Sequence, residues 1–176
     1  MENTSIKNNI ALLGFGVVGK SFFDIIKNNK YDGEKVNVKY IYVREGKSDK
    51  YNKDYNTDIF TSDIDKILNS DVSIVVECAV YNDEIYKYTR DTLLKGKNLI
   101  TSNKKLIGLH YKEFNDICKK TGAKLYYEAS ALGGVNIFHN IFELKKCDKI
   151  ISFDGITLLF PKSICSSFFN SKIIRL

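Results

Sequence analysis

Proline, tryptophan and long apolar stretches are what this chain has least of. Its 176 residues include one proline and no tryptophan, a usage that fits genome base composition better than a function. The polar N-terminus, MENTSIKNN, is followed by a short apolar run that leads into a glycine turn. A membrane helix needs about 20 apolar residues. We therefore expect neither a membrane span nor a signal peptide here.

Paired cysteines are also missing. The four cysteines, Cys78, Cys118, Cys147 and Cys165, are widely spaced and form no CxxC pair. Zinc-binding and thioredoxin-like sites commonly use such pairs, so neither is predicted. We expect reduced, packed thiols of a cytoplasmic protein.

A concentrated basic patch is absent as well. The net charge is +6 and the pI about 9.0, but the 27 basic residues are scattered among 21 acidic ones. Nucleic-acid binding favours a basic surface with interleaved aromatic residues. We expect a small-molecule substrate rather than a nucleic acid. The length of the chain allows one domain, or one domain and part of a second.

Short apolar runs alternate with helical patterns along the chain. Strands are predicted at 10–13, 36–43, 72–76, 98–100, 124–127 and 149–153. Helices are predicted at 17–26, 62–68 (with Ser62 as the N-cap), 83–94, 111–120 and 135–144. Alternating strands and helices are typical of an α/β fold with a doubly wound, mainly parallel sheet. Neither an internal repeat nor a low-complexity linker interrupts this pattern.

A Gly-x-Gly-x-x-Gly motif lies between the first predicted strand and the first predicted helix, the context that a dinucleotide site requires. Gly14 permits a tight turn, Gly16 lets the backbone approach a pyrophosphate, and Gly19 allows close helix–strand packing. The helix N-terminus adds unpaired amides and the positive end of a dipole. The alternative is a corner whose glycines serve packing alone. The candidate cofactor contacts are Gly14, Phe15, Gly16, Val17, Val18 and Gly19.

The ribose partner of such a site follows the second strand. That strand is predicted to end at Val43, so Arg44 comes next and Glu45 after it. An arginine there can pair with the 2′-phosphate of NADP, whereas an acid favours the 2′-hydroxyl of NAD. We favour Arg44 and NADP, and Glu45 with NAD is the alternative. Lys47 and Lys50 either assist or are solvated surface lysines.

The sequence VECA, residues 76–79, ends a later strand on the nicotinamide side of the sheet. We expect the backbone at Ala79 to face the cofactor. Glu77 has two interpretations: an acid of the site, or a strand-end residue near solvent.

Two further segments place polar or glycine-rich sequence at strand ends: TSNKK (101–105) and YYEASALGGVNI (126–137). Together with GFGVVG (14–19) and VVE (75–77), TSNKKLI (101–107) and YYEASALGGV (126–135) resemble the nucleotide-binding domain of homoserine dehydrogenase over about residues 8–156. The resemblance implies a Rossmann-type NAD(P)-binding domain. It also implies hydride transfer between NAD(P)H and L-aspartate 4-semialdehyde to give L-homoserine, in threonine, methionine and isoleucine biosynthesis.

The resemblance further implies a role for the Asn-Lys turn. Lys104 corresponds to the lysine beside the nicotinamide and the reacting carbon, where an ammonium group can polarise a carbonyl oxygen and supply a proton. Ser102 and Lys104 are therefore expected to contact the cofactor. Without the resemblance, Lys104 would be a surface lysine in a turn. Lys105 is expected to be solvated or to face a phosphate.

A monovalent cation such as sodium is implied by the same family. Its ligands, largely backbone carbonyls, correspond to Glu128, Ala131, Gly133 and Val135. Oxygen ligands from a glycine-rich loop suit a hard cation. Asn136 stands where the family usually has proline, and the alternative is a hinge at Gly133–Gly134.

The resemblance ends near Ile156. The last twenty residues, TLLFPKSICSSFFNSKIIRL, contain no acid and hold Pro161, whereas the family continues into a second domain that completes the active site and forms a homodimer. We expect an NAD(P)-binding domain at 8–148 and the start of a truncated or frame-shifted region at 149–176. The alternatives are a divergent C-terminus, a nucleotide-binding unit without turnover, and another dehydrogenase of similar fold.

Overall fold

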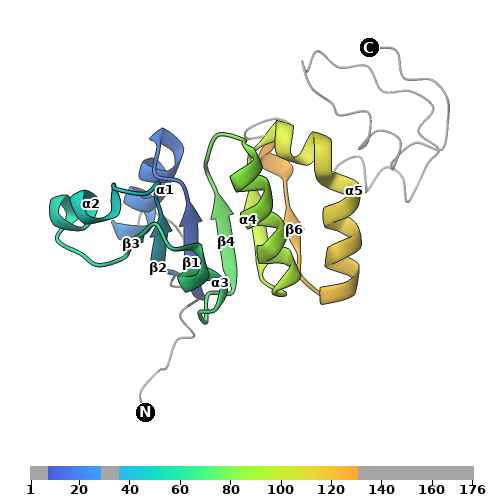
Figure 1. Cartoon of the computed structure of the whole chain (residues 1–176), viewed down its shortest axis with the longest axis horizontal. Helices are drawn as coiled ribbons and strands as arrows, with labels where there is room; N and C mark the ends of the chain where they lie inside the picture. Colours follow the sequence, from blue (N-terminus) through green and yellow to red (C-terminus); the bar gives the residue numbers. More distant parts are fainter. Residues whose placement is uncertain (1–7, 29–35, 131–176) are drawn as a thin grey trace.

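The computed structural model describes residues 8–28 and 36–130, which form a parallel α/β sheet (Figure 1). Within these residues the sheet has six strands in the order β3-β2-β1-β4-β5-β6. The strands are β1 (Asn8–Leu13), β2 (Val36–Tyr42), β3 (Phe60–Thr61), β4 (Ile74–Glu77), β5 (Asn98–Thr101) and β6 (Leu125–Tyr126). The predicted doubly wound, parallel fold is confirmed.

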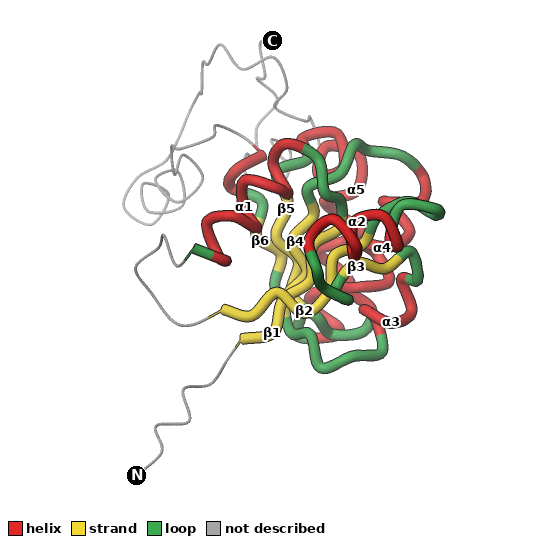
Figure 2. The backbone as a smooth tube through the Cα atoms, turned by 90° about the vertical axis from the view of Figure 1, so that its left-hand side faces the viewer, coloured by secondary structure: helices red, strands yellow, loops and turns green. Residues whose placement is uncertain are grey.

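The connecting helices cover both faces of this sheet (Figure 2). They are α1 (Val17–Lys27), α2 (Ser48–Tyr55), α3 (Ile64–Leu68), α4 (Asp83–Leu94) and α5 (Lys104–Thr121). From β1 the chain proceeds outward to β2 and β3, and from β4 it proceeds in the opposite direction to β5 and β6. Since crossovers between parallel strands are right-handed, the connecting helices of these two halves lie on opposite faces of the sheet.

Side chains alternate between two cores along the central strands. Ala11 and Leu13 pack with α3, α4 and α5, whereas Ile10 and Leu12 pack on the other face with Phe23 of α1. Successive strand residues point to opposite faces, so a continuous apolar run is needed to serve both cores. This explains why the central strands contain little polar sequence.

The strand order reverses between β1 and β4, which pair in parallel from Ile10↔Ile74 to Leu13↔Glu77. The loops after these two strands leave in opposite directions and open a crevice at the carboxyl edge of the sheet. Ligands of doubly wound sheets bind at such a switch point.

Two elements, α2 and β3, were not predicted. The sequence of α2, SDKYNKDY, has low hydrophobicity and none of its residues is fully buried, so it gives little helical signal. Strand β3 is only two residues long. Its pairing with β2 extends the sheet, and tertiary context rather than local pattern determines it.

Helix α5 begins at Lys104, and not at Tyr111 as predicted. The sequence KKLIGLH places Leu106 and Ile107 in the core, and Asn103 caps the helix, so the Asn-Lys turn is the first turn of a helix. The cap of α3 is Asp63 instead of Ser62, because its carboxylate accepts from the Asp65 amide at 2.9 Å.

The other predicted elements agree within two residues, and α4 agrees at both ends. The helix predicted at 135–144 and the strand at 149–153 lie outside the described residues. In the described part, no helix combines the length and apolarity that crossing a membrane requires.

Candidate cofactor-binding site

The glycine turn lies at the switch point and is held by close backbone contacts. Gly14 has φ +102°, a backbone conformation that residues with a side chain rarely adopt. A Cβ at this position would lie 3.1 Å from Ala79. A Cβ on Gly19 would overlap the carbonyl oxygen of Gly14. A Cβ on Gly16 would meet no described atom within 4 Å. Gly14 and Gly19 are thus required by packing, while Gly16 leaves its backbone open.

Helix α1 starts directly after this open backbone. Its N-cap is Gly16, and no side chain among the described residues caps its first amides. An anion beside these amides would accept their hydrogen bonds and meet the positive end of the helix dipole. Val17 and Val18 lie in this first turn, 85% and 57% exposed.

Phe15 has a different place from the rest of the motif. Its ring is buried and makes edge contacts with Phe23, Tyr51 and Phe60 at centroid distances of 4.8–5.8 Å. It anchors the turn to α1, α2 and β3. Any contact it makes with a cofactor is therefore through its backbone or its exposed edge.

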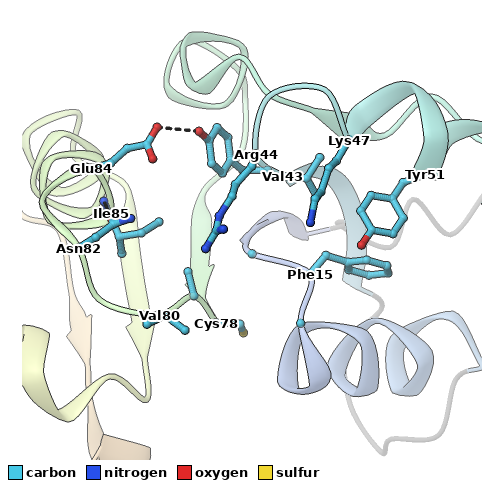
Figure 3. A pocket seen from close by; sticks show the side chains of 14 residues that line it. Phe15, Val43, Arg44, Lys47, Tyr51, Cys78, Val80, Asn82, Glu84 and Ile85 are labelled. Atoms are coloured by element: carbon cyan, nitrogen blue, oxygen red, sulfur yellow. Dashed lines mark hydrogen bonds between the residues drawn. The ribbon is translucent and has the colours of Figure 1, made fainter.

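A cleft of about 350 Å³ opens between the glycine turn and the loop after β4. Gly14, Phe15 and Gly16 line one side, Ala79 and Val80 the other, and Arg44 and Lys47 reach it from the loop after β2 (Figure 3). The two cationic side chains extend into the space between the walls. Lys50 is exposed on α2 and is not among the residues that line this cleft.

A second cleft, of about 580 Å³, adjoins the first and shares Arg44 with it. Glu45 lines the second cleft and Glu84 lines both, so the clefts around Arg44 contain one further cation, Lys47, and two acids. Tyr42 and Tyr88 donate to the same carboxylate oxygen of Glu84, at 3.0 and 2.6 Å. Burial and the Glu84 carboxylate raise the pKa of Tyr88, so this phenol stays protonated.

Glu77 fits neither interpretation offered by the sequence. It is 1% exposed and accepts hydrogen bonds from the Thr101 hydroxyl at 2.5 Å and from the Ala79 amide at 2.8 Å. Burial raises the pKa of its carboxyl group, and these donors oppose that shift. It is neither near solvent nor a lining residue of either cleft, and it connects the ends of β4 and β5.

The Asn-Lys turn lies at the end of β5. The Asn103 side chain accepts from the Leu106 amide at 3.1 Å and donates to the Ala79 carbonyl at 3.3 Å. Ser102 and Lys104 are exposed beside this cap. Lys105 is exposed too, and its ammonium lies 4.7 Å from the ring centre of Tyr81, so its neighbour is an aromatic face.

Cys78 lines the first cleft but is poorly suited to nucleophilic work. Burial, with a smaller contribution from the Glu77 carboxylate, raises the pKa of its thiol to about 11. The thiolate is the reactive form. At pH 8 we expect alkylation of Cys78 by iodoacetamide to be about 100-fold slower than in the urea-unfolded chain, because each pKa unit is a factor of ten.

Mass spectrometry of the peptide that contains Cys78 would give this rate separately from the other cysteines. Equal rates in the folded and unfolded chains would contradict a buried thiol at this position.

The proposed cation ligands lie only partly within the described residues. Glu128 begins a short 3-10 helix, η1 (Glu128–Ser130), and its Oε2 is buried with no hydrogen-bond partner in the described part of the structure. Ala131, Gly133 and Val135 lie outside the described residues.

Several residues of the clefts were not found from the sequence. Asn82 and Glu84 come from the start of α4, and Tyr42 and Tyr51 from β2 and α2. Asn82 had a detectable signal, since an asparagine before an apolar helical pattern favours an N-cap, and its side chain accepts from the Ile85 amide at 2.8 Å. Nothing in the sequence marks Tyr42 as a cleft residue, because it fits the alternating pattern of the strand to which it belongs.

The strand order 3-2-1-4-5-6 with a glycine turn at the switch point defines the Rossmann class of dinucleotide-binding domains. Within this class, a match to a family model identifies the family. The family model described as "Homoserine dehydrogenase, NAD binding domain" matches residues 14–128, and the chain belongs to this family.

Curated relatives agree with this assignment. Homoserine dehydrogenase of Lactococcus lactis is 32% identical over 156 residues, which cover 84% of this chain and 36% of that protein. The Bacillus subtilis homoserine dehydrogenase is 29% identical over 153 residues, 84% of this chain and 35% of that protein. The chain thus spans about a third of the length of these relatives.

Solved structures show the same fold. An S. aureus homoserine dehydrogenase aligns with a TM-score of 0.63 and 32% identity, covering 73% of this chain and 33% of that one. A hyperthermophilic archaeal homoserine dehydrogenase, solved in complex with NADPH, aligns with a TM-score of 0.61 over 77% of this chain and 48% of that one. At 22% identity, the second likeness concerns the fold alone.

Proposed function

We propose that this chain is the cofactor-binding part of a homoserine dehydrogenase that prefers NADP. The observation that carries the proposal is the cleft at the switch point, where Arg44 and Lys47 face the glycine turn. A dinucleotide pyrophosphate would meet the amides of α1 at Gly16, and the 2′-phosphate would meet Arg44. Glu45 lines only the second cleft of the two, which favours Arg44 over Glu45 as the ribose ligand.

The reaction would be hydride transfer between NADPH and L-aspartate 4-semialdehyde, giving L-homoserine for threonine, methionine and isoleucine biosynthesis. The nicotinamide supplies the hydride chemistry. Lys104 is the proposed catalytic residue of this chain, because an exposed ammonium in the first turn of α5 can polarise the carbonyl oxygen and supply its proton. Ser102 and the Ala79 backbone are proposed to contact the cofactor beside it.

A titration of the purified chain with NADPH and NADH would test the cofactor proposal. We expect the chain to bind NADPH at least about tenfold more tightly, since one charge-assisted contact contributes about 1.5–3 kcal/mol. Nicotinamide fluorescence gives both dissociation constants. Equal affinities would contradict the preference for NADP, and binding of neither cofactor would contradict the function.

A monovalent cation such as sodium is proposed beside Glu128. The support is the buried Oε2 of this residue, an oxygen that finds no partner among the described atoms, together with the oxygen preference of hard cations. Ala131, Gly133 and Val135 are proposed as further ligands on the family resemblance. The cation would hold the loop after β6.

Binding without turnover is the second candidate. It is favoured by the extent of the match, since this chain spans about a third of each curated relative. We propose a cofactor domain at 8–148 and dimerisation of the family through residues after it. We expect the chain alone to bind cofactor with little catalysis. Homoserine-dependent NADP reduction at a rate near that of a full-length family member would contradict the second candidate.

A further inference from the structure

Four hydrogen bonds connect the ends of β4 and β5 in a closed ring. The Thr101 hydroxyl and the Ala79 amide donate to the two oxygens of Glu77, at 2.5 and 2.8 Å. The Asn103 amide donates to the Thr101 oxygen at 3.0 Å, and the Asn103 side chain donates to the Ala79 carbonyl at 3.3 Å. Glu77 and Thr101 are the last residues of β4 and β5, and Ala79 and Asn103 lie two residues further along.

A carboxylate is an unusual residue at the place where this ring closes. Glu77 is 1% exposed and lies in the ladder between Leu13 and Thr101. An apolar residue would satisfy the sheet, whereas a buried carboxylate carries a desolvation cost that only its hydrogen bonds offset. One oxygen accepts from Ala79 in the loop after β4 and the other from Thr101, the last residue of β5. The carboxylate therefore serves the strand ends and the loops that follow them rather than the core.

Lys104 directly follows Asn103, which is a member of the ring. Asn103 is at once a member of the ring and the N-cap of α5, where it accepts from the amide of the fully buried Leu106. Lys104 is the first helical residue, so its backbone has little freedom once Asn103 is held. The contact between Lys105 and Tyr81 adds a second tie from the first turn of α5 to the loop after β4.

We propose that Glu77 is a positioning residue: its carboxylate holds Ala79 and Thr101 against Asn103 and thereby sets the place of Lys104 at the start of α5. Of the two tests of this role, only the second rests on the proposed function.

Two substitutions of Glu77 distinguish the loss of its hydrogen bonds from other effects of changing the residue. Glu77→Gln keeps an oxygen for the Ala79 amide, and its NH₂ group can donate to Thr101, whose hydroxyl then rotates. Glu77→Ala removes both contacts. A positioning role therefore predicts that glutamine restores what alanine loses.

The first test uses the amide NMR spectrum of the ligand-free chain. In Glu77→Ala we expect the amide signals of Asn103, Lys104 and Leu106 to shift and the Leu106 amide to exchange at least about tenfold faster, because the cap loses its support. In Glu77→Gln these signals should lie near those of the unaltered chain. Unchanged signals at 103–106 in Glu77→Ala would overturn the proposal.

A control for stability is available in α4. Thr92 is also fully buried, and its hydroxyl donates to the Tyr88 carbonyl at 2.8 Å, away from the ring. Thr92→Val should destabilise the chain without moving the 103–106 signals. Where Glu77→Ala gives no folded protein, Thr101→Val against Thr101→Ser provides the same comparison, with serine expected to restore the signals.

The second test is a double-mutant cycle for NADPH affinity with Lys104→Met. If Glu77 acts through Lys104, we expect Glu77→Ala to lower the affinity about fivefold in the unaltered background and less than about twofold beside Lys104→Met. Additive losses would overturn the proposal. Failure of the unaltered chain to bind NADPH would overturn the proposed function instead, and the NMR comparison would still decide the role of Glu77.

Discussion

Replacing Arg44 with alanine is expected to lower the affinity for NADPH by about 10- to 100-fold. A hydrogen bond to a charged group contributes about 1.5–3 kcal/mol, and each 1.4 kcal/mol is a factor of ten. The Arg44 guanidinium extends into the cleft beside the glycine turn, where its planar fork suits a phosphate. NADH lacks the 2′-phosphate, so its affinity should change by less than about threefold.

Lys50→Ala provides the matched control for this substitution. Lys50 is an exposed cation six positions further along the same segment, and it is not among the residues lining either cleft. Its removal changes the net charge equally but should leave the preference for NADPH over NADH intact. Fluorescence titrations of both variants give the comparison. An unchanged cofactor preference in Arg44→Ala would refute the role assigned to Arg44.

Alanine at Gly19 is expected to lower the free energy of unfolding by about 2 kcal/mol. The added Cβ would overlap the Gly14 carbonyl oxygen, a backbone atom that cannot move without shifting the turn. Overpacking costs about 1–3 kcal/mol, and a clash with a backbone atom lies at the upper end of that range. The higher helix propensity of alanine returns about 1 kcal/mol, which leaves a loss of about 2 kcal/mol. Because α1 must move away from the turn, cofactor binding should be lost as well. Urea unfolding and NADPH titration measure the two effects.

Gly16→Ala is the contrasting substitution in the same motif. A Cβ there meets no described atom within 4 Å, so we expect a stability loss below about 1 kcal/mol, the scale of an altered N-cap. The methyl group would occupy the space through which a pyrophosphate approaches, and affinity should fall at least about tenfold. Equal stability losses at Gly16 and Gly19 would contradict the distinction between the two glycines.

The sequence predicted the parts of the fold that depend on local pattern. The apolar run before Gly14 and the helical spacing after Gly19 gave β1, the turn and α1, because a buried parallel strand and an amphipathic helix each have their own period. Gly122, with φ +78°, ended α5 as expected of a left-handed C-cap. The family resemblance, carried by motifs at the strand ends, was confirmed by the family match over 14–128.

Local pattern failed where polar sequence folds for non-local reasons. Helix α2 is polar throughout, yet Tyr51 and Tyr55 pack on Phe15 at centroid distances of 5.5 and 5.4 Å. That contact joins residues about forty positions apart and exists only once the sheet has formed. The start of α5 was placed seven residues too late because lysines and asparagine in TSNKK read as a turn.

The sequence by itself determined the class of this protein: glycine spacing, strand–helix alternation and strand-end motifs are local or nearly local properties, and they specify a dinucleotide-binding domain of the homoserine dehydrogenase family. Tertiary structure alone decided how the site is assembled. It brought Arg44 and Lys47 to face Gly14 and Gly16, and it closed the ring around Glu77. The reason is that parallel strands distant in sequence end at one edge of the sheet, so contacts there depend on strand order and register.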